Sequence, residues 1–148
     1  MINVQDVDWV RLTRFASDVT LKATGKACVV RGGFESGCWG SAGFDGRFYE
    51  IELTLSQPRE QLARTFLHEL GHCANNHPRR TIKSGGLTLR TVDYVEDAAF
   101  REGVRARLHT IESEADAFAD AAQGIFEQEM GMAWREWPFV GTVAGNRA

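Results

Sequence analysis

The chain has 148 residues, of which 43% are hydrophobic and 25% charged, a balance typical of one folded globular domain. Its net charge of −3 argues against direct binding of nucleic acid or of an anionic membrane, and its three cysteines, without a C-x-x-C pair, argue against a cystine scaffold or a zinc ribbon. Because neither a signal peptide nor an apolar run of about 20 residues is evident, we expect a cytoplasmic protein with no membrane contact.

The first part of the chain is predicted to contain one helix and two strands. Apolar residues recur at helical intervals between Asp8 and about Ala23, which predicts an N-terminal helix with an acidic cap. A short strand is expected at 27–30, and the glycine-rich segment 32–46 is expected to be a loop or an irregular hairpin. Residues 47–55 alternate between apolar and polar side chains, the pattern of a half-buried strand.

The second part of the chain is predicted to be mainly helical. A helix is expected over 58–75, a basic loop over 78–92, and helical sequence from there to about Met130, with room for a break near Gly103 or Thr110. Asp93 and Glu96 form an Asp-x-x-Glu variant of the capping box at the start of this last helix. We therefore predict a single domain over 1–148, with a C-terminal tail at 130–148. Its fold class is expected to be α+β.

The pentapeptide His68-Glu69-Leu70-Gly71-His72 is an H-E-x-x-H motif. Side chains four apart on a helix lie about 5–6 Å apart on one face, so both imidazoles can bind one zinc ion at about 2.0–2.1 Å. On a helical wheel the two histidines point away from the apolar arc of this helix. We therefore predict that His68 and His72 bind zinc.

A catalytic zinc ion needs a third protein ligand and keeps one position open for water. His77 does not fit the H-E-x-x-H-x-x-G-x-x-H pattern, because it lies nine residues after His68 and no glycine precedes it at position 75. We therefore expect His77 at the rim of a cleft or on the surface.

The better candidate for the third ligand is Glu112. It shares one flank of an apolar helical stripe with Asp116, and packing of this stripe beside the metal helix would bring Glu112 to the zinc ion. Asp116, one turn later, is expected to accept the free ring N–H of a ligating histidine. Glu114 points in another direction on the helical wheel and is expected to take no part in the metal site.

The two motifs, His68-Glu-Leu-Gly-His72 and Glu112-x-Glu-Ala-Asp-x-Phe-Ala119, together resemble the gluzincin zinc metallopeptidases. Among them the chain is most similar to the ImmA/IrrE-type family of small bacterial and mobile-element proteases. The resemblance implies a small zincin-like domain with an N-terminal helix, a short sheet containing antiparallel strands, the H-E-x-x-H helix and a following helix that supplies the glutamate ligand.

The resemblance also implies a mechanism and a class of substrate. Zinc ligation by His68, His72 and Glu112 and general-base catalysis by Glu69 carry over from the family. The predicted function is that of an endopeptidase with one Zn²⁺ per chain, in which Glu69 acts on a zinc-bound water. The expected partner is a peptide or protein substrate, such as a DNA-binding repressor, which could pair with the strand at 49–55 if that strand lies at a free edge.

Two other functions remain open from the sequence. Glu35-Ser36-Gly37-Cys38, upstream of the histidines, faintly resembles a motif of peptide deformylase, in which a cysteine is the third metal ligand. In that case Cys38 would replace Glu112 in the site. The third possibility is a zinc-stabilised binding or adaptor protein whose protease site is vestigial.

Overall fold

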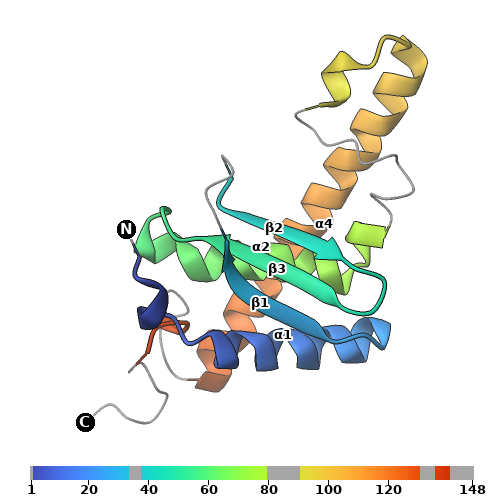
Figure 1. Ribbon diagram of the computed structural model, residues 1–148. Coiled ribbons are helices and arrows are strands. Elements are labelled where there is room, and N and C mark those ends of the chain that lie inside the picture. The colour runs from blue at the N-terminus through green and yellow to red at the C-terminus, as the bar shows by residue number, and fades with distance from the viewer. Residues whose placement is uncertain (1, 34–37, 80–90, 131–135, 141–148) are drawn as a thin grey trace.

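The computed structural model describes residues 2–33, 38–79, 91–130 and 136–140. A three-stranded sheet forms one layer, helices α1 and α2 cover one of its faces, and the long helix α4 packs on α2 (Figure 1). This arrangement confirms the predicted α+β class. The predictions made for Glu35 and for most of the basic loop lie outside the described residues.

Helix α1 (Trp9–Thr24) begins and ends close to the predicted positions. The side chain of Asp8 caps it by accepting a hydrogen bond of 3.1 Å from the backbone N–H of Arg11. Gly25 ends the helix in the left-handed conformation, with φ 78°. The helix also supplies partners for backbone groups at the edge of the sheet. The hydroxyl of Ser17 donates to the carbonyl of Cys28 at 3.0 Å and accepts from its N–H at 2.9 Å.

The sheet contains strands β1 (Cys28–Gly33), β2 (Gly40–Phe44) and β3 (Tyr49–Thr54) in the order β1-β3-β2. Strand β3 pairs in parallel with β1 and antiparallel with β2. The prediction of a loop or an irregular hairpin over 32–46 did not give the bounds of β2, because glycine and other small residues give no alternation of apolar and polar side chains. The condition for substrate pairing with residues 49–55 is also not met, since β3 is central and the outer strands of the described sheet are β1 and β2.

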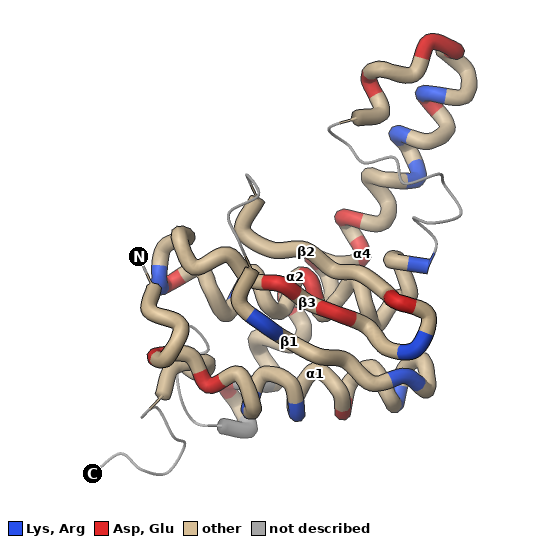
Figure 2. Tube along the Cα trace, viewed as in Figure 1, with Lys and Arg blue, Asp and Glu red and all other residues tan. Residues whose placement is uncertain are grey.

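One face of the sheet is buried and the other carries charged side chains. The inward side chains of β3 are fully buried; they are Tyr49, Ile51 and Leu53. On the outer face, acidic and basic residues of neighbouring strands lie side by side (Figure 2), and Arg31 Nη2 lies 2.7 Å from Glu52 Oε1. Trp137 and Phe139, near the C-terminus, are buried against the same core.

Helix α2 (Leu62–Ala74) follows a 3₁₀ turn at Arg59–Gln61 and agrees closely with the predicted helix. Its buried side chains include Phe66, Leu67 and Leu70. These form the apolar arc that the helical wheel places opposite the two histidines.

Helix α4 (Ala98–Met130) is continuous, so the helical sequence predicted up to Met130 is confirmed and the break that it allowed near Gly103 or Thr110 does not occur. The predicted capping box is also wrong: Asp93 lies in a separate 3₁₀ helix, η3 (Val92–Tyr94). The side chain of Asp97 instead accepts a hydrogen bond of 2.8 Å from the N–H of Phe100 at the start of α4.

The first turns of α4 project beyond the rest of the molecule, together with η3 (Figure 1). They carry a small apolar cluster of their own, formed by Val92, Val104 and Leu108. None of the helices in the described part of the chain combines the length and the apolar character needed to span a membrane.

Helices α2 and α4 lie very close to each other at Gly71. A Cβ atom at this position would lie 2.8 Å from the carbonyl oxygen of Ala115 and 3.0 Å from Cβ of Phe118. The first of these contacts is with backbone, which cannot rotate away. Gly71 therefore permits a helix contact that any other residue would prevent.

We expect Gly71→Ala to lower the free energy of unfolding by about 1–3 kcal/mol, because the added methyl group forces the two helices apart. Gly103→Ala is the matched control on α4: no described atom beyond its own helix lies within 4 Å of the added Cβ. This control should raise stability by about 0.5–1 kcal/mol, since alanine favours a helix. Urea unfolding measures both values, and equal effects of the two substitutions would contradict the close helix contact.

Candidate metal centre

Three side chains of α2 form a cluster that could hold a metal ion. His68, Glu69 and His72 each offer one ligand atom, and these atoms all lie within 4.8 Å of one another. The Nε2 atoms of the two histidines are 3.1 Å apart, and their rings meet edge to face at 86°. The helix therefore presents both imidazoles to one point, as the H-E-x-x-H spacing predicts.

Helix α4 brings two acidic side chains to the same place. Glu112 Oε2 lies 2.9 Å from Nε2 of His68, and Glu112 Oε1 lies 3.4 Å from Nε2 of His72. Asp116 Oδ1 lies 2.8 Å from the other ring nitrogen of His68, Nδ1. The structure thus brings together the residues that the sequence analysis selected, while their roles as ligand and as hydrogen-bond partner remain predictions.

The spacing of the ligand atoms can be compared with that of a tetrahedral zinc site. Bonds of about 2.0–2.1 Å at tetrahedral angles place neighbouring ligand atoms about 3.3 Å apart. In the structure the Nε2 atoms of His68 and His72 are 3.1 Å apart, and the two carboxylate oxygens of Glu112 each face one ring, Oε2 at 2.9 Å from His68 and Oε1 at 3.4 Å from His72. Two imidazole nitrogens and a carboxylate oxygen are also ligand types that zinc prefers, so these residues fit the ion.

The charged groups of the site shift one another's proton affinity. The hydrogen bond to Glu112 raises the pKa of His68 to about 9, although partial burial opposes this shift. The same bond and the one to His72 hold the pKa of Glu112 well below its usual value. Burial raises the pKa of Glu69, whose side chain is only 9% exposed. A carboxylate with a raised pKa is a stronger proton acceptor than an ordinary glutamate.

The predictions for His77 and Glu114 are wrong. His77 is 1% exposed rather than at the surface, and its Nδ1 lies 2.9 Å from Nδ1 of His72. Its Nε2 lies 2.7 Å from Oε2 of Glu114, which is therefore connected to the site. The signal available in the sequence was the pair Asn75-Asn76 directly after the helix, since asparagine favours a chain reversal.

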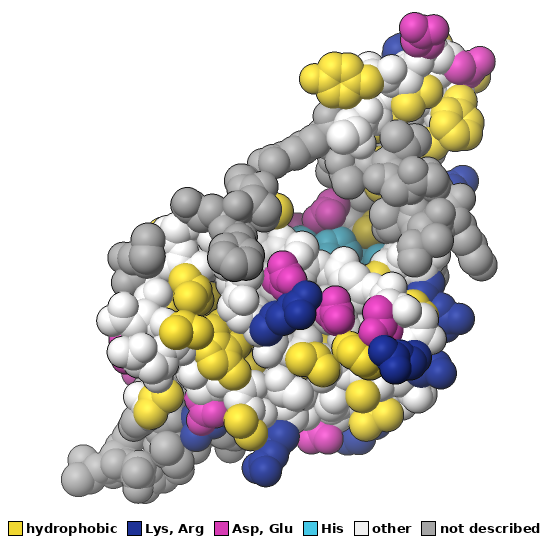
Figure 3. Space-filling model, in the orientation of Figure 1, with side chains coloured by type: hydrophobic (Ala, Val, Ile, Leu, Met, Phe, Trp, Pro, Cys, Tyr) yellow, Lys and Arg dark blue, Asp and Glu magenta, His cyan; other side chains and the backbone are white. Residues whose placement is uncertain are grey.

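Strand β2 runs along the side of the cluster. A Cβ atom at Gly40 would lie 3.0 Å from Cγ of Glu69 and 2.7 Å from Cγ2 of Thr65, so the start of the strand lies directly against these side chains of α2. Figure 3 shows histidine side chains at the bottom of a hollow, with acidic side chains beside them. The candidate site is therefore open to solvent next to the edge of the sheet.

The cysteines do not contribute to the cluster. Cys38 is exposed, and its carbonyl accepts a hydrogen bond of 2.8 Å from the hydroxyl of Thr54. It is absent from the group of possible metal ligands found among the described residues. Cys28 and Cys73 are buried, and their contact, together with burial, raises the pKa of the Cys73 thiol. The raised pKa keeps Cys73 protonated and unreactive.

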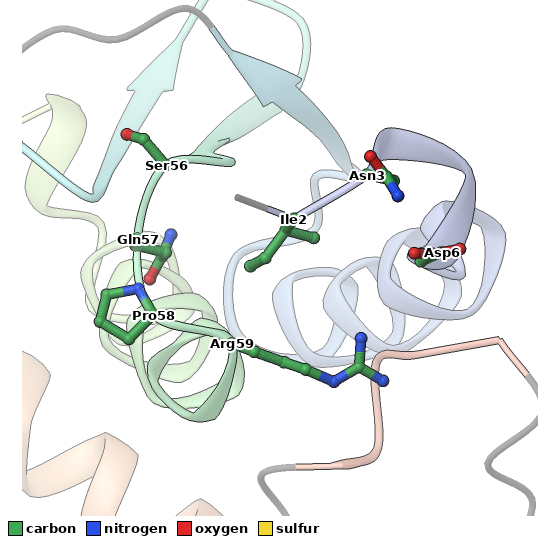
Figure 4. A pocket seen from close by; sticks show the side chains of 7 residues that line it. All are labelled: Ile2, Asn3, Asp6, Ser56, Gln57, Pro58 and Arg59. Carbon is green, nitrogen blue, oxygen red and sulfur yellow. The ribbon is translucent and has the colours of Figure 1, made fainter.

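A separate surface pocket of about 290 Å³ lies between the N-terminal segment and the start of α2 (Figure 4). It is lined by Ile2, Asn3, Asp6 and residues 56–59. None of the residues of the histidine cluster lines it, so it is distinct from the candidate metal centre.

Comparison with known proteins adds no assignment to this site. No model of a protein family matches the chain, and the searches of curated proteins and of solved structures also find no match.

The contact between His68 and Glu112 predicts how the stability of the metal-depleted protein depends on pH. The pKa of His68 is raised from 6.5 to about 9 on folding, so its contribution to stability is complete below about pH 6.5 and is lost as the pH rises through about 9. We expect the midpoint of thermal unfolding in EDTA to fall over this range. Glu112→Gln should flatten the fall, and an unchanged profile in this variant would contradict the prediction.

Proposed function

We propose that the protein is a zinc-dependent endopeptidase in which His68, His72 and Glu112 hold one zinc ion and Glu69 is the general base. The observation that carries this proposal is that the carboxylate of Glu112, on α4, lies 2.9 and 3.4 Å from the Nε2 atoms of His68 and His72, which are themselves 3.1 Å apart and share a cluster on α2 with Glu69. The resemblance of the two motifs to those of the ImmA/IrrE-type metallopeptidases supports the same conclusion.

In the proposed reaction, the zinc ion and the protein side chains have different roles. A bound zinc ion acts as a Lewis acid, which polarises a peptide carbonyl and makes water more acidic. Glu69 accepts a proton from the attacking water and then donates it to the leaving amine. Its burial supports both steps, because a raised pKa favours the protonated carboxyl group that forms between them.

The edge of the sheet supports a peptide as the substrate. Among the described strands, β2 has a neighbour on one side only, β3. Because Gly40 of β2 lies against Glu69, an extended peptide that adds to this edge would place a peptide bond close to the base. That the substrate is a regulatory protein, such as a DNA-binding repressor, is an inference from the family resemblance.

The proposed ligand set predicts which substitutions remove the metal. We expect Glu112→Gln to weaken zinc binding by at least about 100-fold, because it removes a charged ligand. Loss of a residue that only supports a ligand weakens metal binding by about 10–100-fold, so loss of a ligand itself should cost at least the upper value. Cys38→Ala should leave zinc affinity unchanged. Competition with a chromophoric chelator measures both dissociation constants. Loss of zinc from Cys38→Ala alone would overturn the assignment and favour the deformylase-like alternative.

Glu69→Gln separates an enzyme from a binding protein. This variant should retain zinc while cleavage slows by more than about 100-fold, since the amide cannot accept the proton. Cleavage of a library of peptides from denatured proteins, read as new N-termini by mass spectrometry, provides the measurement. Equal cleavage by the variant and the wild type would contradict the role of Glu69, and an adaptor would retain its partner function in the variant.

A further inference from the structure

A third histidine lies behind the candidate metal centre, on the side of His72 that faces away from Glu112. The Nδ1 atoms of His72 and His77 are 2.9 Å apart, whereas Nε2 of His72 faces the candidate ligands. His77 is 1% exposed, and its second ring nitrogen lies 2.7 Å from Glu114. A continuous chain of contacts therefore leads from the proposed metal ligand to an acidic side chain on α4.

The chain reversal after α2 puts His77 in this place. The helix ends at Ala74, and Asn76 adopts the left-handed conformation, with φ 63°. A residue other than glycine in this region needs support from its surroundings, and the hydroxyl of Tyr49 donates a hydrogen bond to the side chain of Asn76. The side chain of Asn75 also donates to the carbonyl of Gly71, at 2.8 Å. The turn is thus fixed from the sheet and from the helix.

The positions of the protons on His72 and His77 follow from the number of hydrogen-bond donors and acceptors on each ring. If Nε2 of His72 binds a metal, the single proton of its neutral ring is on Nδ1, which must donate to Nδ1 of His77. The proton of His77 is then on Nε2, where it donates to the carboxylate of Glu114. Every hydrogen-bonding atom of the two rings then has a partner of the right kind. The opposite tautomer of His77 would place two N–H groups against each other.

From this geometry we propose that His77 is a positioning residue for the metal ligand His72 and that Glu114 fixes the tautomer of His77. This inference rests on the proposed metal site. It gives each histidine ligand its own support: Asp116 contacts Nδ1 of His68 directly, and Glu114 reaches His72 through a buried imidazole. Partners of this kind orient a ligand and increase its basicity.

Two substitutions of His77 distinguish positioning from simple filling of the core. The amide of asparagine occupies the place of Nδ1 of histidine, so His77→Asn retains an acceptor for His72. The amide of glutamine occupies the place of Nε2, so His77→Gln retains only the contact with Glu114. We expect zinc affinity to stay within about threefold of the wild type in His77→Asn and to fall by about 10–100-fold in His77→Gln.

Glu114→Gln tests the far end of the chain and should weaken zinc binding by about tenfold. Its matched control is Asp120→Asn, an exposed acid of α4 that pairs with Arg64 at 2.8 Å and should leave zinc affinity unchanged. Circular dichroism of the metal-depleted variants establishes that each one folds. A folded His77→Gln variant with wild-type zinc affinity would overturn the proposal.

A direct measurement does not depend on the folding of any variant. Long-range ¹⁵N–¹H correlation spectra of the zinc-loaded wild type report the tautomer of each histidine. The expected result is a proton on Nδ1 of His72 and on Nε2 of His77, and a proton on Nδ1 of His77 would overturn the proposal. A wild-type protein that binds no zinc would instead overturn the proposed function, so the two failures are distinguishable.

Discussion

The contact between α2 and α4 at Gly71 determines whether the candidate site can exist. Because the carbonyl of Ala115 would lie 2.8 Å from a Cβ at Gly71, the two helix backbones are nearly in contact, and Glu112, almost one turn before Ala115, can reach both histidines. The glycine inside the H-E-x-x-H motif therefore links the packing of the helices to the proposed ligand set.

The same contact explains how α4 supplies acidic side chains both to the two histidines of α2 and to His77. At about 100° per residue, Glu112 and Asp116 lie on one flank of the buried stripe of α4, and Glu114 lies on the other flank. Both flanks border α2, because the stripe itself packs on that helix. The first flank faces the metal side of the histidines, and the second faces His77 in the segment after α2. Glu114 is therefore close to the segment that follows α2, although it lies on the other side of the buried stripe from Glu112 and Asp116.

Local sequence patterns predicted the helices, the central strand and the residues that meet at the candidate site, because helical periodicity and H-E-x-x-H spacing are set within a few residues. The bounds of strand β2 were not predicted, because its glycines and small side chains show no alternation of apolar and polar residues. The position of His77 was missed for a different reason: it depends on the left-handed turn at Asn76, which is held by Tyr49 from a distant strand. Features that depend on contacts between distant segments give weak local signals.

The charges of the site link metal binding to the stability of the fold. Glu69 is buried by its packing against β2, and its pKa is raised both by that burial and by the nearby charge of Glu112. In the metal-free protein the raised pKa of His68 keeps this ring protonated beside Glu112 near neutral pH, and a divalent cation that replaces this proton would interact favourably with the carboxylates of Glu112 and Glu69. A ligand that binds only the folded chain stabilises it by a free energy that grows with the logarithm of its affinity. The arrangement that makes Glu69 a strong proton acceptor therefore also makes the folded protein favour a bound cation.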